Sequence, residues 1–172
     1  NPGKYTYGND GIGGTMQLAA ERIFQARDID AVAIPFGGAG ETLQNFLGGH
    51  VDIYGGSIST VLPYVENGEA KCPLVTSASD VPALPGASGL AALGMPEKET
   101  LLWRAILGPK DLDPAIVAQL ADVIDRAVND PGYVEFLATK GEVPNVVKGD
   151  ALGARLQDEY DALAEVSKRL GL

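Results

Sequence analysis

Residues 8–15, Gly-Asn-Asp-Gly-Ile-Gly-Gly-Thr, have the types and spacing expected of a loop that binds an anion. The loop follows a short β-branched and aromatic run, Tyr5–Tyr7, and leads into helical periodicity from Gly14 to Phe24. Such a strand–loop–helix junction directs unpaired backbone N–H groups and the positive end of the helix dipole at one small volume. The junction therefore suits a carboxylate or a phosphate. An ordinary βα turn that binds nothing is the alternative interpretation, because Gly-rich turns are common.

Two more strand–loop–helix units are predicted after this junction. The second has a strand over 30–34, a loop over 35–40 and a helix over 41–47, and the third has a strand over 51–54, a loop over 55–57 and a helix over 58–65. A fourth strand is predicted at 73–76. Repeated βα units predict an α/β fold with a mainly parallel sheet and flanking helices. Ligands of such sheets bind beyond the carboxyl ends of the strands, so the three loops are expected to form one binding wall.

The chain changes character after residue 76. Residues 77–99 contain three prolines and only a brief helical stretch near 87–93, so we expect an irregular surface excursion there. A strand over 100–107 follows, and then helices that begin at Asp113-Pro114 and Asp130-Pro131, with a final amphipathic helix over 152–170. These helices need a sheet to pack against, and this part of the chain contributes only one strand. We therefore expect the other strands in another stretch of polypeptide or in another chain. We therefore predict a ligand-binding lobe at 1–99, and at 100–172 a crossover strand and helices that complete a different lobe.

Composition excludes several classes of function. The 23 acidic residues outnumber the 13 basic ones and give a net charge of −10, which argues against nucleic acid as a partner. No run approaches the roughly 18 apolar residues of a membrane span. Cys72 and His50 are the only residues of their types, so an internal disulfide is excluded and a zinc site or Cys–His catalysis is poorly supported. No metal or cofactor is predicted.

Catalytic and nucleotide-binding motifs are also poorly matched. Residues 11–16 approach G-x-G-x-x-G, but Met16 takes the last Gly position and no acidic residue ends the second strand. Ser57 and Ser59 lack the G-x-S-x-G elbow of a serine nucleophile. Glu41 suits the first turn of a helix, and Asp52 suits a solvated strand face. No catalytic residue is predicted from these patterns.

Several short segments, taken in order, resemble one known family. They are Asn1–Lys4, Tyr7-Gly8, Gly11–Gly13, Leu18–Glu21, Ile34–Gly38 (V-P-Y-K-G in the family), Leu47–Asp52 (L-G-G-Q-V-D), Leu62-Pro63, Val75–Ser77 with Pro82–Pro85, and Trp103. Together they resemble the second domain of the substrate-binding proteins of tripartite tricarboxylate transporters, the Bug/TctC family. The resemblance extends from Asn1 to the last helix.

The resemblance implies a two-lobed periplasmic binding protein that closes on a small carboxylate and hands it to membrane permease subunits. It implies that the chain holds the second lobe and the C-terminal part of the first, while the N-terminal half-domain is missing from this sequence, which also carries no signal peptide. Binding would rest on backbone N–H groups of βα loops. The expected ligand-binding residues are Gly8, Asn9, Asp10, Gly11, Gly13, Gly14, Thr15, Phe36, Gly37, Gly38, Gly56 and Ser57.

Some positions depart from the family pattern. Gly14 and Gln17 stand where the family usually has Ser and His, Gly37 where it often has Lys, and Gly55-Gly56 replace a common Phe-Asp pair. These changes remove side chains from the expected binding wall, so the wall is larger or its ligand differs. Two other hypotheses stay open: an α/β enzyme that acts on a small organic acid, and a sensor partner that presents a ligand.

Overall fold

The three predicted βα units form, and their strands make one parallel sheet. The computed structural model describes residues 2–172. Its first half contains β1 (Thr6–Asn9), α1 (Thr15–Ala26), β2 (Val32–Pro35), α2 (Ala39–Leu47), β3 (Ile53–Tyr54) and α3 (Ile58–Glu66). The strand order is β2-β1-β3, with Tyr7 paired to Ala33 on one side and to Ile53 on the other. The predicted α/β class with a parallel sheet is therefore confirmed.

Helices α1 and α2 cover opposite faces of β1. Successive side chains of a strand point to opposite faces, so Tyr7 and Gly8 show which helix lies on which side. Tyr7 packs edge-on against Phe24 of α1, with ring centroids 5.3 Å apart, and its hydroxyl donates to Glu21 Oε1 at 2.6 Å. Gly8 instead faces Thr42 of α2. Both faces of the central strand, β1, are therefore covered by helices.

Helix α2 crosses β1 so closely that only glycine fits at position 8. A Cβ on Gly8 would lie 2.6 Å from Thr42 Cγ2 and 3.2 Å from side-chain atoms of Phe36 and Val51. Thr42 is fully buried, and its hydroxyl donates to the carbonyl oxygens of Asn9 at 3.1 Å and Gly38 at 2.9 Å. The close packing of α2 therefore explains why residue 8 is a glycine.

The predicted fourth strand at 73–76 is wrong. Leu74 makes only an isolated parallel bridge with Ser88, because Val75 N donates to Ser88 O and Ser88 N donates to Pro73 O. This local pairing takes the backbone groups that a sheet neighbour would need. The segment then forms two short 3₁₀ helices, η1 (Leu90–Leu93) and η2 (Pro96–Lys98), and η1 coincides with the brief helix predicted near 87–93.

The predicted strand at 100–107 is wrong as well. The backbone there is extended but has no ladder partner in residues 2–172, and Trp103, Ile106 and Leu107 are exposed. A strand is stable only when its N–H and C=O groups are paired with a neighbour. The chain then continues through α4 (Pro114–Val128), α5 (Pro131–Thr139) and α6 (Asp150–Leu170).

The two predicted Asp-Pro helix starts are confirmed. Asp113 caps α4 by accepting from Ala115 N at 2.8 Å, and Asp130 caps α5 by accepting from Gly132 N at 2.9 Å. Proline follows each cap at the first helical position, where its missing N–H costs nothing. These starts depend on local chemistry alone, which is why the sequence pattern was sufficient to predict them.

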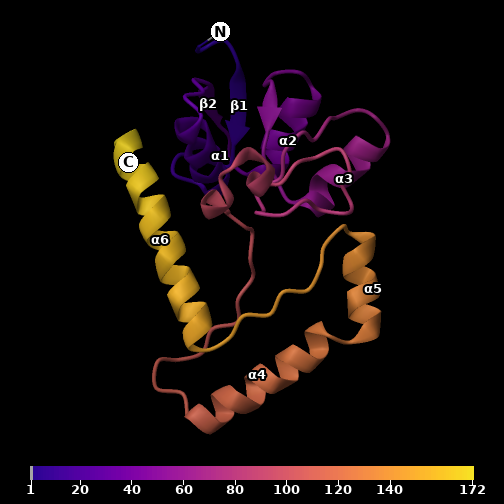
Figure 1. Ribbon diagram of the computed structural model, residues 1–172, viewed down its shortest axis with the longest axis vertical. Coiled ribbons are helices and arrows are strands. Elements are labelled where there is room, and N and C mark those ends of the chain that lie inside the picture. Colours follow the sequence, from indigo (N-terminus) through magenta and orange to yellow (C-terminus); the bar gives the residue numbers. More distant parts are fainter. Residues whose placement is uncertain (1) are drawn as a thin grey trace.

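The last helix returns to the sheet while α4 and α5 do not. In Figure 1, α6 runs beside α1, whereas α4 and α5 lie apart from the strands. Val166 of α6 is buried, but Ile116, Leu120 and Val123 of α4 are each close to half exposed. Within residues 2–172, no helix has both the length and the apolar character that crossing a bilayer requires.

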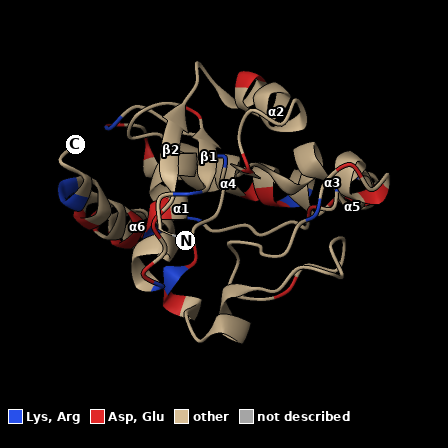
Figure 2. Ribbon diagram, turned by 90° about the horizontal axis from the view of Figure 1, so that it is seen from above, with Lys and Arg blue, Asp and Glu red and all other residues tan. Residues whose placement is uncertain are grey.

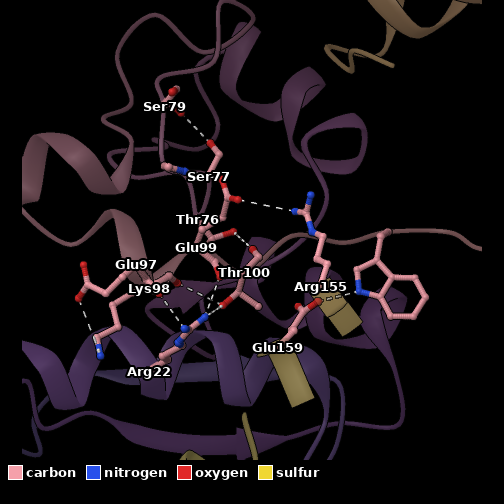
Figure 3. A network of polar contacts seen from close by, with 12 residues as sticks. Arg22, Thr76, Ser77, Ser79, Glu97, Lys98, Glu99, Thr100, Arg155 and Glu159 are labelled. Atoms are coloured by element: carbon pink, nitrogen blue, oxygen red, sulfur yellow. Dashed lines mark hydrogen bonds and ion pairs between the residues drawn. The ribbon is translucent and has the colours of Figure 1, made fainter. Parts of the chain in front are cut away.

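Arg22 on α1 binds residues 97–100, at the start of the extended segment that leads to α4 (Figure 3). Its guanidinium donates to Glu97 O at 2.8 Å, to Glu99 O at 2.7 Å and to Thr100 Oγ1 at 3.0 Å. The Glu99 carboxylate in turn lies 3.6 Å from the guanidinium of Arg155 on α6. Helix α1 therefore joins the sheet, the crossing segment and α6.

Replacing Gly8 by alanine tests the close crossing of α2. We expect Gly8→Ala to destabilise the fold by about 1–3 kcal/mol, because the new methyl group overlaps Thr42 in a packed site. Chemical unfolding followed by circular dichroism measures the change. Gly40→Ala is the matched control, since nothing lies within 4 Å of its Cβ position. Equal stability of the two variants would contradict this packing.

Candidate functional site

The candidate site is the edge of the sheet where all three strands end. β1, β2 and β3 finish at Asn9, Pro35 and Tyr54, and each is followed by a loop and a helix N-terminus. The chain winds from β1 to β2 on one side and continues at β3 on the other, so the winding reverses between β1 and β3. Such a switch point is where open α/β sheets bind ligands.

Hydrogen bonds hold the first two loops side by side. Phe36 N donates to Asn9 O at 3.0 Å, and a Cβ on Gly11 would lie 3.8 Å from Phe36 O. Apart from Gly8, which packs beneath α2, and Thr15, the first residue of α1, the predicted ligand-binding residues lie at the end of β1 or in the loops beyond the three strands. The structure thus brings together the segments that the sequence pattern singled out.

The loop over 8–15 is bonded internally. Gly11 N donates to Asn9 Oδ1 at 3.1 Å, Gly13 N to Gln17 Oε1 at 2.7 Å, and Gly14 N to Gly11 O at 3.0 Å. The N–H groups that we expected to face a ligand therefore point at oxygens of the protein itself. Gln17 is buried and was missed as a loop residue, although its place one helical turn after Gly13 is the signal for such a bond.

Asp10 occupies the N-terminus of α1. Its Oδ1 accepts from Met16 N at 3.3 Å and crowds the position that a Cβ on Gly14 would take. Helix α1 has no acidic residue in its own first turn, so Asp10 is the negative charge that complements the helix dipole. Glu41 has a similar place at α2, where its Oε2 accepts from Gly37 N at 2.7 Å.

The start of α3 has a different character. No acidic residue lies in its first turn, and its N-cap residue, Ser57, makes no side-chain bond to a backbone N–H group. The Ser57 hydroxyl lies 2.7 Å from Thr60 Oγ1 and 3.2 Å from Ser59 Oγ. The first N–H groups of a helix have no intrahelical acceptor. Hydroxyl and N–H donors therefore gather here without an adjacent carboxylate.

Two polar atoms near this edge are buried without a hydrogen-bond partner in residues 2–172. They are Nδ2 of Asn9, a residue with no exposed surface, and the hydroxyl of Tyr54. The Tyr54 ring stacks on Phe46, and a Cβ on Gly56 would lie 2.5 Å from its hydroxyl. Burial, and then the Asp10 charge, raise the pKa of Tyr54, so its hydroxyl stays protonated and able to donate at neutral pH. Unpaired buried groups cost roughly 1–3 kcal/mol each and call for a partner such as a ligand or a water.

Tyr54 was not among the predicted ligand-binding residues. An aromatic residue that ends a strand directly before Gly55-Gly56 was the available signal.

The three loops at this edge contain no Lys, Arg, His or Cys. Residues 5–21 and 31–66 contain no Lys or Arg, and Figure 2 shows the acidic and basic positions along the chain. His50 is exposed just beyond the C-terminal end of α2. The Cys72 thiol donates to Leu74 O at 3.3 Å, and burial raises its pKa. In the described residues, no group of three or more His, Cys, Asp or Glu side chains is placed to hold a metal ion.

Comparison with known proteins gives one family over the whole chain. The sequence model described as "Tripartite tricarboxylate transporter family receptor" matches residues 1–172. Protein BugT of Bordetella pertussis is 28% identical over 171 residues, which are 99% of this chain and 52% of BugT. The chain thus spans about half the length of this relative.

Solved structures share the fold. The periplasmic binding protein BugD superposes with a TM-score of 0.79 at 26% identity, over 99% of this chain and 58% of BugD. The R. palustris protein Rpa4515, solved with adipate, superposes with a TM-score of 0.79 at 22% identity, over 98% of this chain and 57% of its own. The second likeness concerns the fold alone.

Removing the Gln17 acceptor should loosen the Gly13 loop. We expect the Gly13 amide of Gln17→Leu to exchange its hydrogen about two- to tenfold faster, the loss that a net hydrogen bond of about 0.5–1.5 kcal/mol implies. Amide exchange followed by NMR measures it. Gln44→Leu, on an exposed part of α2, is the control. An unchanged Gly13 rate in Gln17→Leu would show that this bond does not hold the loop.

Proposed function

Because the chain belongs to the tripartite tricarboxylate transporter receptor family, we propose that it works as part of an extracytoplasmic substrate-binding protein. It captures a small carboxylate in the periplasm and delivers it, chemically unchanged, to the permease subunits of a tripartite tricarboxylate-type secondary transporter. The chain spans about half the length of BugT. The proposal therefore covers the contribution of these residues to such a protein.

One observation carries the proposal: three helix N-termini meet at the carboxyl edge of a parallel sheet, at its switch point. Helix N-termini bind anions through backbone N–H groups and the helix dipole, so this arrangement suits a carboxylate. The adipate in the Rpa4515 structure is a dicarboxylate and supports the same ligand class. Asp10 complements the start of α1 and Glu41 that of α2, whereas α3 has no acidic residue in its first turn. We therefore assign the ligand's carboxylate to the start of α3, at Ser57.

The proposed ligand-binding surface keeps the residues expected from the sequence and adds one. Gly8 supports it from beneath, and Tyr54 contributes its unpaired hydroxyl. Its other members are Asn9, Asp10, Gly11, Gly13, Gly14, Thr15, Phe36, Gly37, Gly38, Gly56 and Ser57.

The apolar surface of α4 supports a division into two parts. We propose that residues 1–99 form the ligand-binding lobe and that residues 100–172 pack against polypeptide equivalent to the part of BugT that this chain does not match. Ile116, Val117, Leu120 and Val123 of α4 are exposed. Covering each such side chain stabilises a complex by roughly 1.5–3 kcal/mol. Contiguous exposed apolar surface of this kind marks an interaction site.

Titration with a dicarboxylate tests the function. In two-dimensional ¹H–¹⁵N NMR of the 172-residue chain, added adipate should shift the amides of Ser57, Ile58 and Gly38 first. Ser57→Ala should weaken binding by about ten- to a hundredfold, as expected for loss of one hydrogen bond to a charged group. Shifts centred on Arg22 and Arg155 instead would place the ligand elsewhere. Spectra of the acid after incubation show whether it is unchanged, and any conversion would favour an enzyme.

Self-association tests the exposed face of α4. We expect the isolated chain to associate as its concentration rises, because apolar side chains of α4 are in contact with water. Leu120→Lys should shift it toward monomer, while Gln119→Lys on the same helix should not. Size-exclusion chromatography with light scattering measures the mass. A stable monomer of the unmodified chain at all concentrations would refute the proposed packing.

A further inference from the structure

The turn that ends α5 lies against α3, the helix at whose start we place the ligand's carboxylate (Figure 1). A Cβ built on Gly141 would lie 2.8 Å from both Ile58 Cγ2 and Ala83 Cβ. It would also lie 3.3 Å from Leu62 Cδ2. Ile58 and Leu62 belong to α3, and Ala83 belongs to the irregular segment after it. The backbone at residue 141 is therefore in close contact with the part of the chain that carries the sheet.

Two independent features require glycine at position 141. Its φ of +69° is a left-handed conformation that other residues disfavour. This conformation ends α5, because it allows Glu142 N to donate to Leu137 O at 3.0 Å. The contact with α3 would exclude a side chain at this position whatever the value of φ. The same turn therefore ends α5 and seats it on α3.

Ile58 is held from two sides. On one side it packs against a cluster of buried apolar side chains, Val75, Leu84 and Ala87. On another side its Cγ2 atom meets the backbone at Gly141. Ile58 is the first residue of α3 and directly follows the N-cap, Ser57. The position of Ile58 therefore sets the position of the helix start.

The start of α3 has little side-chain support of its own. Ser57 makes no capping bond to a backbone N–H group, and the first turn contains no acidic residue. Asp10 and Glu41 accept from backbone N–H groups at the starts of α1 and α2. Packing against the turn after α5 is thus a restraint on α3 that does not occupy its N–H groups.

We propose that Gly141 is a positioning residue for the carboxylate site: the turn over 137–142, seated on Ile58, fixes the start of α3 in the geometry that binds the ligand. The effect passes through Ile58 and needs no contact between the turn and the ligand. The binding part of the inference rests on the proposed function, whereas the restraint on α3 does not. Because coupling between two sites is reciprocal, a ligand at Ser57 also stabilises the seated turn.

Amide hydrogen exchange of the 172-residue chain, followed by NMR, tests the restraint. Val61 N donates to Ser57 O at 3.2 Å and so reports on the first turn of α3. Gly141→Ala should speed exchange at Val61 about fivefold or more, the effect expected of one methyl group inserted into a packed site. Gly13, in the loop before α1, should keep its rate. This difference separates local loosening of α3 from a general loss of stability.

Gly94→Ala is the matched control. Gly94 has the same φ of +69°, but nothing lies within 4 Å of its Cβ position. The control therefore introduces the same backbone strain without the overlap, and exchange at Val61 should stay at the rate of the unmodified chain.

Titration with adipate tests the consequence for binding. Gly141→Ala should raise the Kd about fivefold or more, because the start of α3 is no longer held, while Gly94→Ala should leave the Kd unchanged. In the unmodified chain, saturating adipate should slow exchange at Glu142 by a comparable factor, as reciprocity requires.

A second variant loosens the same contact without inserting an atom. Ala83→Gly removes the methyl group that lies next to Gly141. The loss of this apolar contact should speed exchange at Val61 about two- to fourfold. This variant decides the question if the spectrum of Gly141→Ala shows an unfolded chain.

The outcomes separate this inference from the proposed function. Unchanged exchange at Val61 in both Gly141→Ala and Ala83→Gly would overturn the restraint on α3, as would equal acceleration at Val61 and Gly13. Faster exchange at Val61 with an unchanged Kd for adipate would overturn the role of Gly141 in binding. If Val61 responds but adipate does not bind the unmodified chain, the restraint stands and the proposed carboxylate function fails.

Discussion

The close crossing of α2 over β1 is the contact on which the binding edge depends. At Gly8 the helix approaches so near that a single methyl group would overlap Thr42, and the Thr42 hydroxyl bonds to the carbonyl oxygen of Asn9. The same carbonyl oxygen of Asn9 also accepts from Phe36 N, so the loops after β1 and β2 lie side by side next to this contact. A glycine inside a strand is thus as important to the site as the glycines in its loops.

The proposed carboxylate site lies in an acidic chain. With a net charge of −10 and no basic residue in the loops, attraction must come from helix N-termini, which act only within the first turn. Two of the three N-termini are already matched by the protein's own carboxylates, Asp10 and Glu41. The third, at Ser57, is open. The loop that contains Asp10 therefore presents hydrogen-bond acceptors, while the start of α3 at Ser57 presents hydrogen-bond donors.

Helix α1 connects this surface to the second half of the chain. One end of α1 carries the Gly-rich loop, while Arg22 on its side holds Glu97, Glu99 and Thr100, and α6 packs along it. Glu99 reaches both α6, through Arg155, and the segment after α3, by accepting from Ala78 N at 2.8 Å. Residues 100–172 are joined to the site by this network rather than by the sheet.

The amino-acid sequence by itself determined the features that depend on neighbours a few residues apart. The βα units, the Asp113 and Asp130 caps and the parallel sheet were predicted because caps, turns and periodicity are local. The family, too, was recognised from short motifs in order. The tertiary structure decided what depends on distant partners. Residues 73–76 and 100–107 have strand-like composition, but a strand forms only where another backbone is available to pair with it. Likewise, only the folded chain shows that Gln17 and Asp10 occupy the loop's N–H groups and that Asn9 and Tyr54 are left unpaired, because burial and hydrogen-bond partners are properties of the packed molecule.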